Sequence, residues 1–158
     1  MGKALNSNNL VTQSKIIFWD FDGVIKDSVS VKVESFCRLF ESYGSEVEAK
    51  IKIHNEKNGG MSRFDKIPLY LEWVGEKITQ SRIDELCNEF SDLVLDGVIN
   101  SDWIPGVENY LRTNQFGQVF IVVSATPKDE LDIIIKKLGL SHVFHSVIGS
   151  PTSKKKWN

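Results

Sequence analysis

The sequence predicts an α/β protein in which a helical insertion interrupts a parallel-sheet core. Two segments, residues 15–21 and 118–125, are continuously apolar, which is typical of strands buried on both faces of a parallel sheet. A helical pattern and a third short strand, residues 145–149, follow the second segment and predict a right-handed βαβ unit. Four helical patterns lie between the first two strands, so we expect a helical subdomain there.

The composition is typical of a folded globular protein. Hydrophobic residues make up 41% of the 158 positions and charged residues 25%, which excludes disorder along the whole chain. The net charge of −2 gives no electrostatic footprint for nucleic acid, and no apolar run is long enough to span a membrane. Cys37 and Cys87 lie in apolar helical patterns, so we expect buried, reduced thiols and a cytoplasmic protein.

The first elements are a lead-in, a strand and a helix. Residues 1–14 are polar, and we expect them to be flexible. The strand of residues 15–21 runs into an Asp-Gly turn. Asp27 or Ser28 can cap the helix that follows, and Gly44 is a suitable stop for it.

Three further helices complete the insertion, which we place at residues 31–101. Ser45 with Glu48 has the spacing of a capping box, and Ser62 can cap a third helix that contains Pro68. The fourth helix has a single apolar stripe with helical spacing, formed by Ile83, Leu86, Cys87, Phe90, Leu93 and Val94.

The α/β core comprises residues 15–30 and 102–158. After the insertion we expect a short helix and then the strand of residues 118–125. Thr126 can cap a helix whose first position is Pro127, which suits proline because that position needs no N–H donor. The third strand then returns parallel to the second.

Asp20, Asp22 and Gly23 form the first motif that carries chemistry. Two carboxylates two residues apart at a strand end can supply a nucleophile or metal ligand together with an acid/base group. The alternatives are an acidic turn or a calcium loop. An EF-hand loop, however, needs a preceding helix and glycine at its sixth position, whereas here a strand precedes and glycine is fourth.

Ser124 and Thr126 form the second motif. A hydroxyl at a strand end, followed by the start of a helix, is suited to binding phosphate because free N–H groups point at the anion. The alternative is that Thr126 only caps the helix and Ser124 only ends the strand.

The third motif, Gly149-Ser150-Pro151 followed by Lys154, comes directly after the third strand. Lys154 can bring a positive charge to the same edge of the sheet. Taken by itself, Lys154 is better interpreted as a solvated charge in a basic tail.

The order of these motifs, with a helical insertion after the first, resembles the haloacid dehalogenase-like hydrolase superfamily. More specifically, it resembles the phosphoglycolate phosphatase-like and β-phosphoglucomutase-like branch. The resemblance extends from Lys15 to Lys154, and its most specific part, FWDFDGVIKDS, continues into Asp27 and Ser28. It implies a Rossmann-like core with an inserted helical-bundle cap.

The resemblance also implies catalytic roles. Asp20 would attack phosphorus and form an aspartyl-phosphate. Asp22 would protonate the leaving alkoxide and then deprotonate the hydrolytic water. Ser124 would hydrogen-bond the phosphoryl group, and Lys154 would neutralise charge between Asp20 and the phosphoryl oxygens. Cations at these positions suit the chemistry, because nucleophile and phosphoryl group are both negative.

The implied cofactor is Mg²⁺, bound by Asp20 and by the backbone carbonyl of Asp22. The implied substrate is a small phosphorylated metabolite, with Gly23 and Ala125 among the residues that bind it. In the cap, Arg63 is our candidate for gripping a substrate anion. The alternative for Arg63 is an exposed arginine near a helix start.

The family's fourth motif, an acidic pair after a further strand that completes the magnesium site, has no counterpart here. Only four residues follow Lys154, so we expect an incomplete sheet from a frameshifted, partial or shortened gene, with weaker magnesium binding and turnover. We also expect residues 15–21 to be an edge strand. A long apolar edge is a template for another chain, which predicts self-association or poor solubility.

These observations favour a magnesium-dependent phosphatase of a small phosphorylated metabolite. A sugar phosphomutase of the same superfamily has the same motifs and differs in how the cap shields the intermediate from water. A catalytically inactive fragment, acting as a binding module or without function, is the alternative of a different class.

Overall fold

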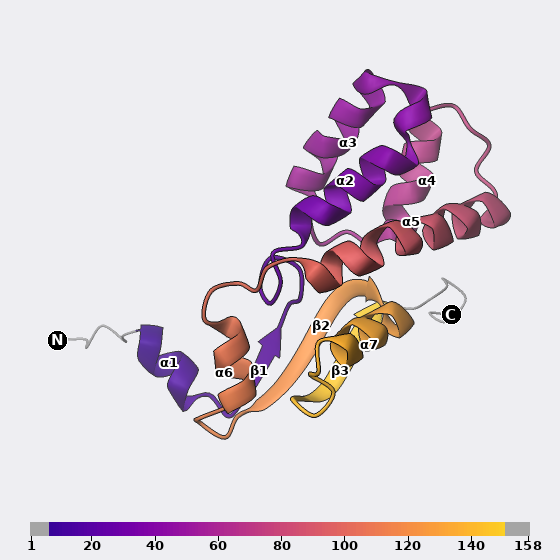
Figure 1. The fold of residues 1–158 in the computed structure, drawn as a ribbon. Coiled ribbons are helices and arrows are strands. Elements are labelled where there is room, and N and C mark those ends of the chain that lie inside the picture. Colours follow the sequence, from indigo (N-terminus) through magenta and orange to yellow (C-terminus); the bar gives the residue numbers. More distant parts are fainter. Residues whose placement is uncertain (1–6, 151–158) are drawn as a thin grey trace.

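The computed structural model describes residues 7–150, which form a helical part and a sheet with its helices (Figure 1). The helical part contains α2 (Val29–Leu39), the short 3-10 helix η1 (Glu41–Tyr43), α3 (Ser45–Lys57), α4 (Arg63–Trp73) and α5 (Gln80–Asn100). The remaining elements are α1 (Ser7–Gln13), β1 (Ile16–Trp19), α6 (Val107–Thr113), β2 (Val119–Pro127), α7 (Lys128–Lys137) and β3 (Phe144–Ser150).

The three strands form one parallel sheet in the order β1-β2-β3. Ile16 pairs with Val119 and Phe18 with Ile121, while Val123 of β2 pairs with Ile148 of β3. The predicted parallel sheet and βαβ unit are therefore confirmed. Among the strands of residues 7–150, β1 lies at an edge of the sheet, as expected.

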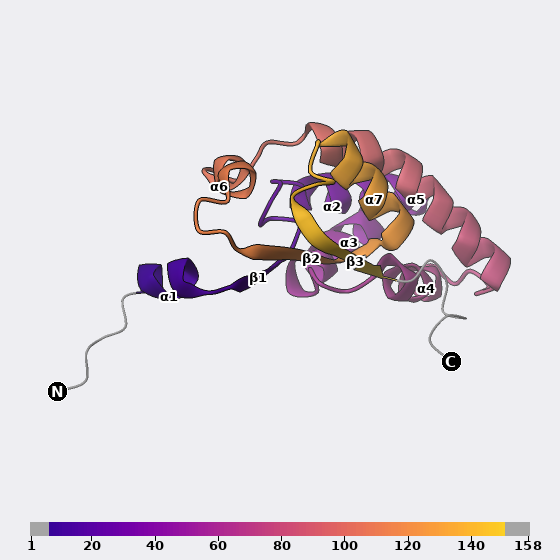
Figure 2. The ribbon, with the colours of Figure 1, turned by 90° about the horizontal axis from the view of Figure 1, so that it is seen from below.

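Helices cover one face of the sheet (Figure 2). On that face Trp19 packs against Tyr110 of α6 and against Phe120, with ring centroids 5.8 and 5.6 Å apart. The apolar side of α7, including Leu131 and Ile134, is fully buried. This face holds the core of the sheet part.

The other face of the sheet is open, so the prediction that the first strand is buried on both faces is wrong. Ile16 is 53% exposed and Phe18 66% exposed. The strand register places three residues of β2 and β3 on the same face of the sheet, and their side chains are exposed as well: Val119, Val123 and Ile148. Within residues 7–150 the apolar run of β1 is therefore covered on one face of the sheet only, the face that carries Trp19.

The helical part has its own apolar core, centred on aromatic side chains. Phe36 of α2 stacks on Phe90 of α5 at 4.1 Å and meets the edge of Tyr70 of α4 at 5.5 Å. The stripe predicted for the fourth helix is confirmed, because Leu86 and Val94 of α5 are buried with Phe90. This core holds α2, α4 and α5 together.

Several predicted helix ends differ from the structure. Ser45 is the first residue of α3 and its N-cap is Gly44, which has φ 92°, so the capping box does not form. Ser62 does cap α4, accepting a hydrogen bond from Phe64 N at 3.3 Å. The lead-in expected to be flexible contains α1, and Gln118 donates to the carbonyl of Val11, the fifth residue of that helix.

Both cysteines are free and buried, as predicted. Burial raises the pKa of the Cys87 thiol to about 11, so this thiol stays protonated and unreactive near neutral pH. None of the helices within residues 7–150 combines the length and apolar character needed to cross a bilayer.

Candidate active site

The paired aspartates lie just past the carboxyl end of β1. Asp20 follows the last residue of the strand, and its Oδ1 accepts a hydrogen bond from Phe21 N at 2.7 Å. The chain then turns through Gly23, whose φ of 74° is a left-handed conformation that glycine adopts without strain. The turn brings Ser28 back to Asp22, whose side chain lines a cavity together with the end of β2.

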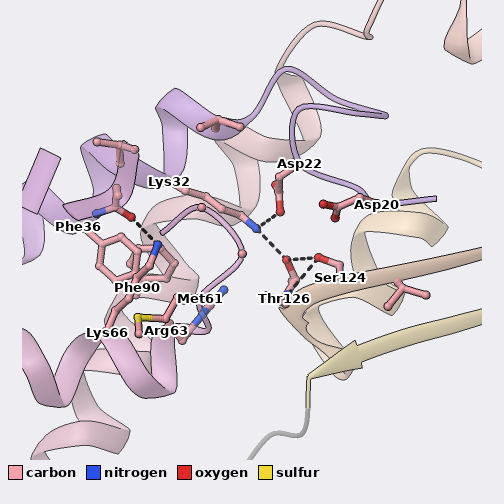
Figure 3. A pocket seen from close by; sticks show the side chains of 17 residues that line it. Asp20, Asp22, Lys32, Phe36, Met61, Arg63, Lys66, Phe90, Ser124 and Thr126 are labelled. Atoms are coloured by element: carbon pink, nitrogen blue, oxygen red, sulfur yellow. Dashed lines mark hydrogen bonds and ion pairs between the residues drawn. The ribbon is translucent and has the colours of Figure 1, made fainter. Parts of the chain in front are cut away.

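A cavity of about 420 Å³ lies between the helical part and the ends of β1 and β2 (Figure 3). Its charged and hydroxyl side chains come from both parts of the molecule, and they are Asp20, Asp22, Lys32, Arg63, Lys66, Ser124 and Thr126. Ala125 also lines it, whereas Gly23 does not. Of the predicted site, Lys154 lies outside the described residues.

Lys32 of α2 connects the helical part to the loop after β1 and to β2. Its ammonium forms an ion pair with Asp22 and donates to Thr126 Oγ1 at 2.8 Å. Sequence reasoning missed Lys32, because a lysine in the first turn of an amphipathic helix is usually solvated. Its place one turn after Ser28, on the same helical face, was the signal that could have found it.

Ser28 also binds Asp22, and its side chain does not cap its own helix. It occupies the N-cap position of α2 without making a side-chain cap, and its hydroxyl donates to Asp22 Oδ1 at 2.7 Å. Asp22 therefore accepts hydrogen bonds on both carboxylate oxygens, from Ser28 and from Lys32. Two contacts of this kind fix the carboxylate in one orientation.

Ser124 and Thr126 form a pair of buried hydroxyls at the end of β2. Their oxygens are 3.1 Å apart, and Ser124 Oγ also accepts from Thr126 N at 3.1 Å. Thr126 does not cap the next helix as predicted, because β2 continues to Pro127, which holds the N-cap position of α7. Its hydroxyl is directed to Lys32 instead.

Gly149 of the third motif allows β3 to approach this strand end. A Cβ at Gly149 would lie 2.6 Å from Lys128 Cα and 2.7 Å from Thr126 O. Both neighbours are backbone atoms, so a side chain at this position would force the two segments apart. The glycine of the motif thus has a packing role beneath the hydroxyl pair.

Arg63 lines the cavity, but its guanidinium is bound by another group. It forms a two-pronged ion pair with Glu130 of α7, at 2.7 and 2.9 Å, and donates to Ser91 at 2.7 Å. The side chains are 4% and 8% exposed, so the alternative of an exposed arginine is wrong. This pair connects α4 of the cap to the core.

Oxygen donors suited to Mg²⁺ are present, although within residues 7–150 no group of three His, Cys, Asp or Glu side chains is arranged to hold a metal. Mg²⁺ often binds proteins through one or two carboxylates, with water and substrate phosphate completing its shell. The Asp20 carboxylate, which has no cationic partner within the described ranges, and the nearby Asp22 carbonyl match that donor set.

Similar proteins share this architecture. A β-phosphoglucomutase from Clostridium difficile matches with a TM-score of 0.70 and 21% identity, over 90% of this chain and 64% of that one. A predicted phosphoglycolate phosphatase from Haemophilus somnus matches with a TM-score of 0.64 and 18% identity, over 90% and 65%. A predicted phosphatase from Clostridium acetobutylicum gives 0.64 and 15%, over 87% and 62%. At these identities the likeness is one of fold.

The chain thus spans less than two thirds of the length of these structures. Comparison with curated protein sequences gives no significant match. The sequence model of haloacid dehalogenase-like hydrolases, however, matches residues 16–157, which is nearly the whole chain. The strand order, the aspartate pair after β1 and this match agree, and the chain belongs to the haloacid dehalogenase-like hydrolase family.

Proposed function

We propose that this chain is the cap and part of the core of a phosphatase that hydrolyses a small phosphorylated metabolite. One observation carries the proposal. Asp20, Asp22 and Ser124, from the ends of two adjacent parallel strands, line a single cavity with Lys32. A carboxylate nucleophile, an acid/base group, a hydroxyl donor and a cation are the groups that phosphoryl transfer needs.

In the proposed reaction, a carboxylate oxygen of Asp20 attacks phosphorus and the bond to the substrate alkoxide breaks. The alkoxide takes a proton from Asp22, leaving an aspartyl-phosphate. Asp22 then accepts a proton from water as the water oxygen attacks phosphorus, which releases inorganic phosphate and restores Asp20. Acid/base help of this kind typically contributes roughly a hundredfold to ten-thousandfold.

The surrounding residues support these roles. Ser28 and Lys32 hold the Asp22 carboxylate toward the cavity. Ser124 and the backbone beyond it are suited to binding phosphoryl oxygens, because donors at a strand end followed by a helix face the anion. Asp20 and the Asp22 carbonyl are the groups that would hold Mg²⁺, which would offset the negative charge of nucleophile and phosphate. Lys154, just beyond the described residues, remains a proposed second cation.

The test compares wild type with Asp20→Asn, using p-nitrophenyl phosphate and Mg²⁺. Removal of the nucleophile is expected to lower kcat by roughly a thousandfold or more. Asp27→Asn is the matched control, because Asp27 is an exposed aspartate of the same segment that does not line the cavity. Its kcat should stay close to wild type. A wild-type rate no higher than that of Asp20→Asn would refute the proposal and favour a binding module. Interconversion of sugar phosphates would favour a phosphomutase.

A further inference from the structure

Lys66 is a buried cation on the cap side of the cavity to which the proposed mechanism gives no role. It lies in the first turn of α4, is 4% exposed and lines the cavity (Figure 3). Its ammonium donates to Asn55 Oδ1 at 2.6 Å. Within residues 7–150 it makes no ion pair, whereas an ammonium can donate three hydrogen bonds.

The hydrogen-bond network of the cap holds Lys66 in this position. Asn55 is itself buried, and its amide group donates to Ile51 O at 2.9 Å and to Tyr70 Oη at 3.0 Å. Both donors are thus committed, and the amide oxygen must face Lys66. The ring of Phe36 lies 5.4 Å from the ammonium. A neutral amide and an aromatic face orient the charge without neutralising it.

The charges around the cavity leave Lys66 without a counter-ion among the described residues. Lys32 is paired with Asp22, and Arg63 with Glu130. Burial, followed by repulsion from Lys32, lowers the pKa of Lys66 to about 8. The ammonium is still the main form at neutral pH. A buried charge without a partner is costly, so an anion that entered the cavity beside it would be stabilised.

We propose that Lys66 binds a second anionic group of the substrate, a carboxylate or a further phosphate, while the reacting phosphoryl group sits at Asp20. The inference rests on the proposed function, since it concerns the same cavity. Asp20 and Ser124 lie on the core side and Lys66 on the cap side (Figure 3), so the two ends of a small metabolite can each contact one part of the protein. Substrates with two anionic groups are therefore preferred.

The test uses matched substrate pairs that differ in the second anion. 3-Phosphoglycerate carries a carboxylate where glycerol 3-phosphate has a hydroxymethyl group, and fructose 1,6-bisphosphate has one phosphate more than fructose 6-phosphate. Phosphate release gives kcat/KM for each. The ratio within a pair is taken from one protein preparation, so it does not depend on how much of a variant is folded.

Lys66→Met should lower the ratio of charged to uncharged substrate by about tenfold to a hundredfold, the loss of one charge-assisted contact. The pair that responds identifies the anion. Lys57→Met, an exposed lysine of the same helical part, is the control and should leave both ratios unchanged. Unchanged ratios in Lys66→Met, with activity retained, would overturn the subsite and leave the phosphatase intact.

A second measurement needs no turnover. Calorimetric titration of 3-phosphoglycerate and fructose 1,6-bisphosphate into Asp20→Asn, with and without Lys66→Met, reports the subsite alone. Weaker binding after Lys66→Met supports the subsite even if the wild type hydrolyses nothing. The absence of hydrolysis would then refute only the phosphatase. If wild type is inactive and the titrations show no dependence on Lys66, the subsite is overturned as well.

Discussion

Two residues at the start of α2 bind Asp22, and these contacts connect the cap to the proposed acid/base group. Ser28 at the N-cap and Lys32 one turn later lie on the same helical face, and both bind its carboxylate. Lys32 reaches Thr126 as well. Two residues of one short helical turn thus orient the proposed acid/base group and contact the strand that bears Ser124.

The burial of Lys66 predicts that the free energy of unfolding depends on pH. Its pKa is about 8 in the folded protein, against 10.5 for an ordinary lysine. Between these values the unfolded chain binds more protons, so this lysine makes the free energy of unfolding rise with pH from about 8 to about 10.5. Below pH 8 both states are protonated and the dependence vanishes.

The measurement is chemical denaturation of wild type and Lys66→Met across pH 7 to 10.5. The difference between the two proteins isolates Lys66, because the titration of Cys87 and Tyr70, both shifted upward by burial, affects both equally. Wild type should gain stability relative to the variant as pH rises above about 8. A difference that does not change with pH would mean that Lys66 titrates normally.

At the level of elements, the cap is attached to the core by buried polar contacts between helices. Arg63 of α4 and Glu130 of α7 form the most deeply buried ion pair in the described part of the chain. The guanidinium also lies 4.5 Å from the ring of Phe90 on α5. Three helices therefore meet at one cation, and its counter-ion comes from the core.

Glu130→Ala should destabilise the fold by roughly 3–5 kcal/mol, because it leaves the buried charge of Arg63 without a partner. Glu108→Ala is the matched control. It removes an i,i+4 pair with Arg112 whose side chains are 42% and 41% exposed, and such pairs contribute about 1 kcal/mol or less. Urea denaturation gives both values. Equal losses would show that Arg63 finds another partner when Glu130 is removed.

At the scale of the whole molecule, the three-stranded sheet has helices on one side and exposed apolar side chains on the other. In the described part of the chain β1 is also an edge strand, with backbone groups directed away from β2. An apolar edge of this kind pairs readily with a second chain. Self-association through residues 15–21, expected from the sequence, stays a prediction. Phe18 is the residue of this strand whose substitution tests it.

Phe18→Lys should therefore reduce association of this chain, which light scattering during size-exclusion chromatography measures over a range of concentrations. Ile53→Lys is the control, because Ile53 is a similarly exposed apolar residue, 52% accessible, on α3 of the cap. Wild type and Ile53→Lys should form dimers or larger species as concentration rises. Wild type that stays monomeric at every concentration would contradict the prediction.

Much of the fold was predictable because it depends on local patterns. Continuous apolar runs marked β1 and β2, and the stripe around Phe90 marked α5. Helix ends were less predictable. Ser45 and Ser28 are of a residue type that often caps helices. Ser45, however, is the first residue of its helix, and the Ser28 hydroxyl binds Asp22 and not the backbone of α2. A side chain that can cap a helix can equally serve a distant carboxylate, and local sequence does not distinguish the two.

The sequence by itself determined that Asp20, Asp22 and Ser124 lie at one edge of the sheet, because the carboxyl ends of adjacent parallel strands meet there. Only the tertiary structure decided that Lys32 joins them, that Arg63 is neutralised by Glu130 and that Lys66 is buried without a counter-ion. These outcomes depend on which side chains meet across the interface between cap and core. That pairing is set by the packing of whole helices, and among these three residues only Lys32, one turn after Ser28, had a local signal in the sequence.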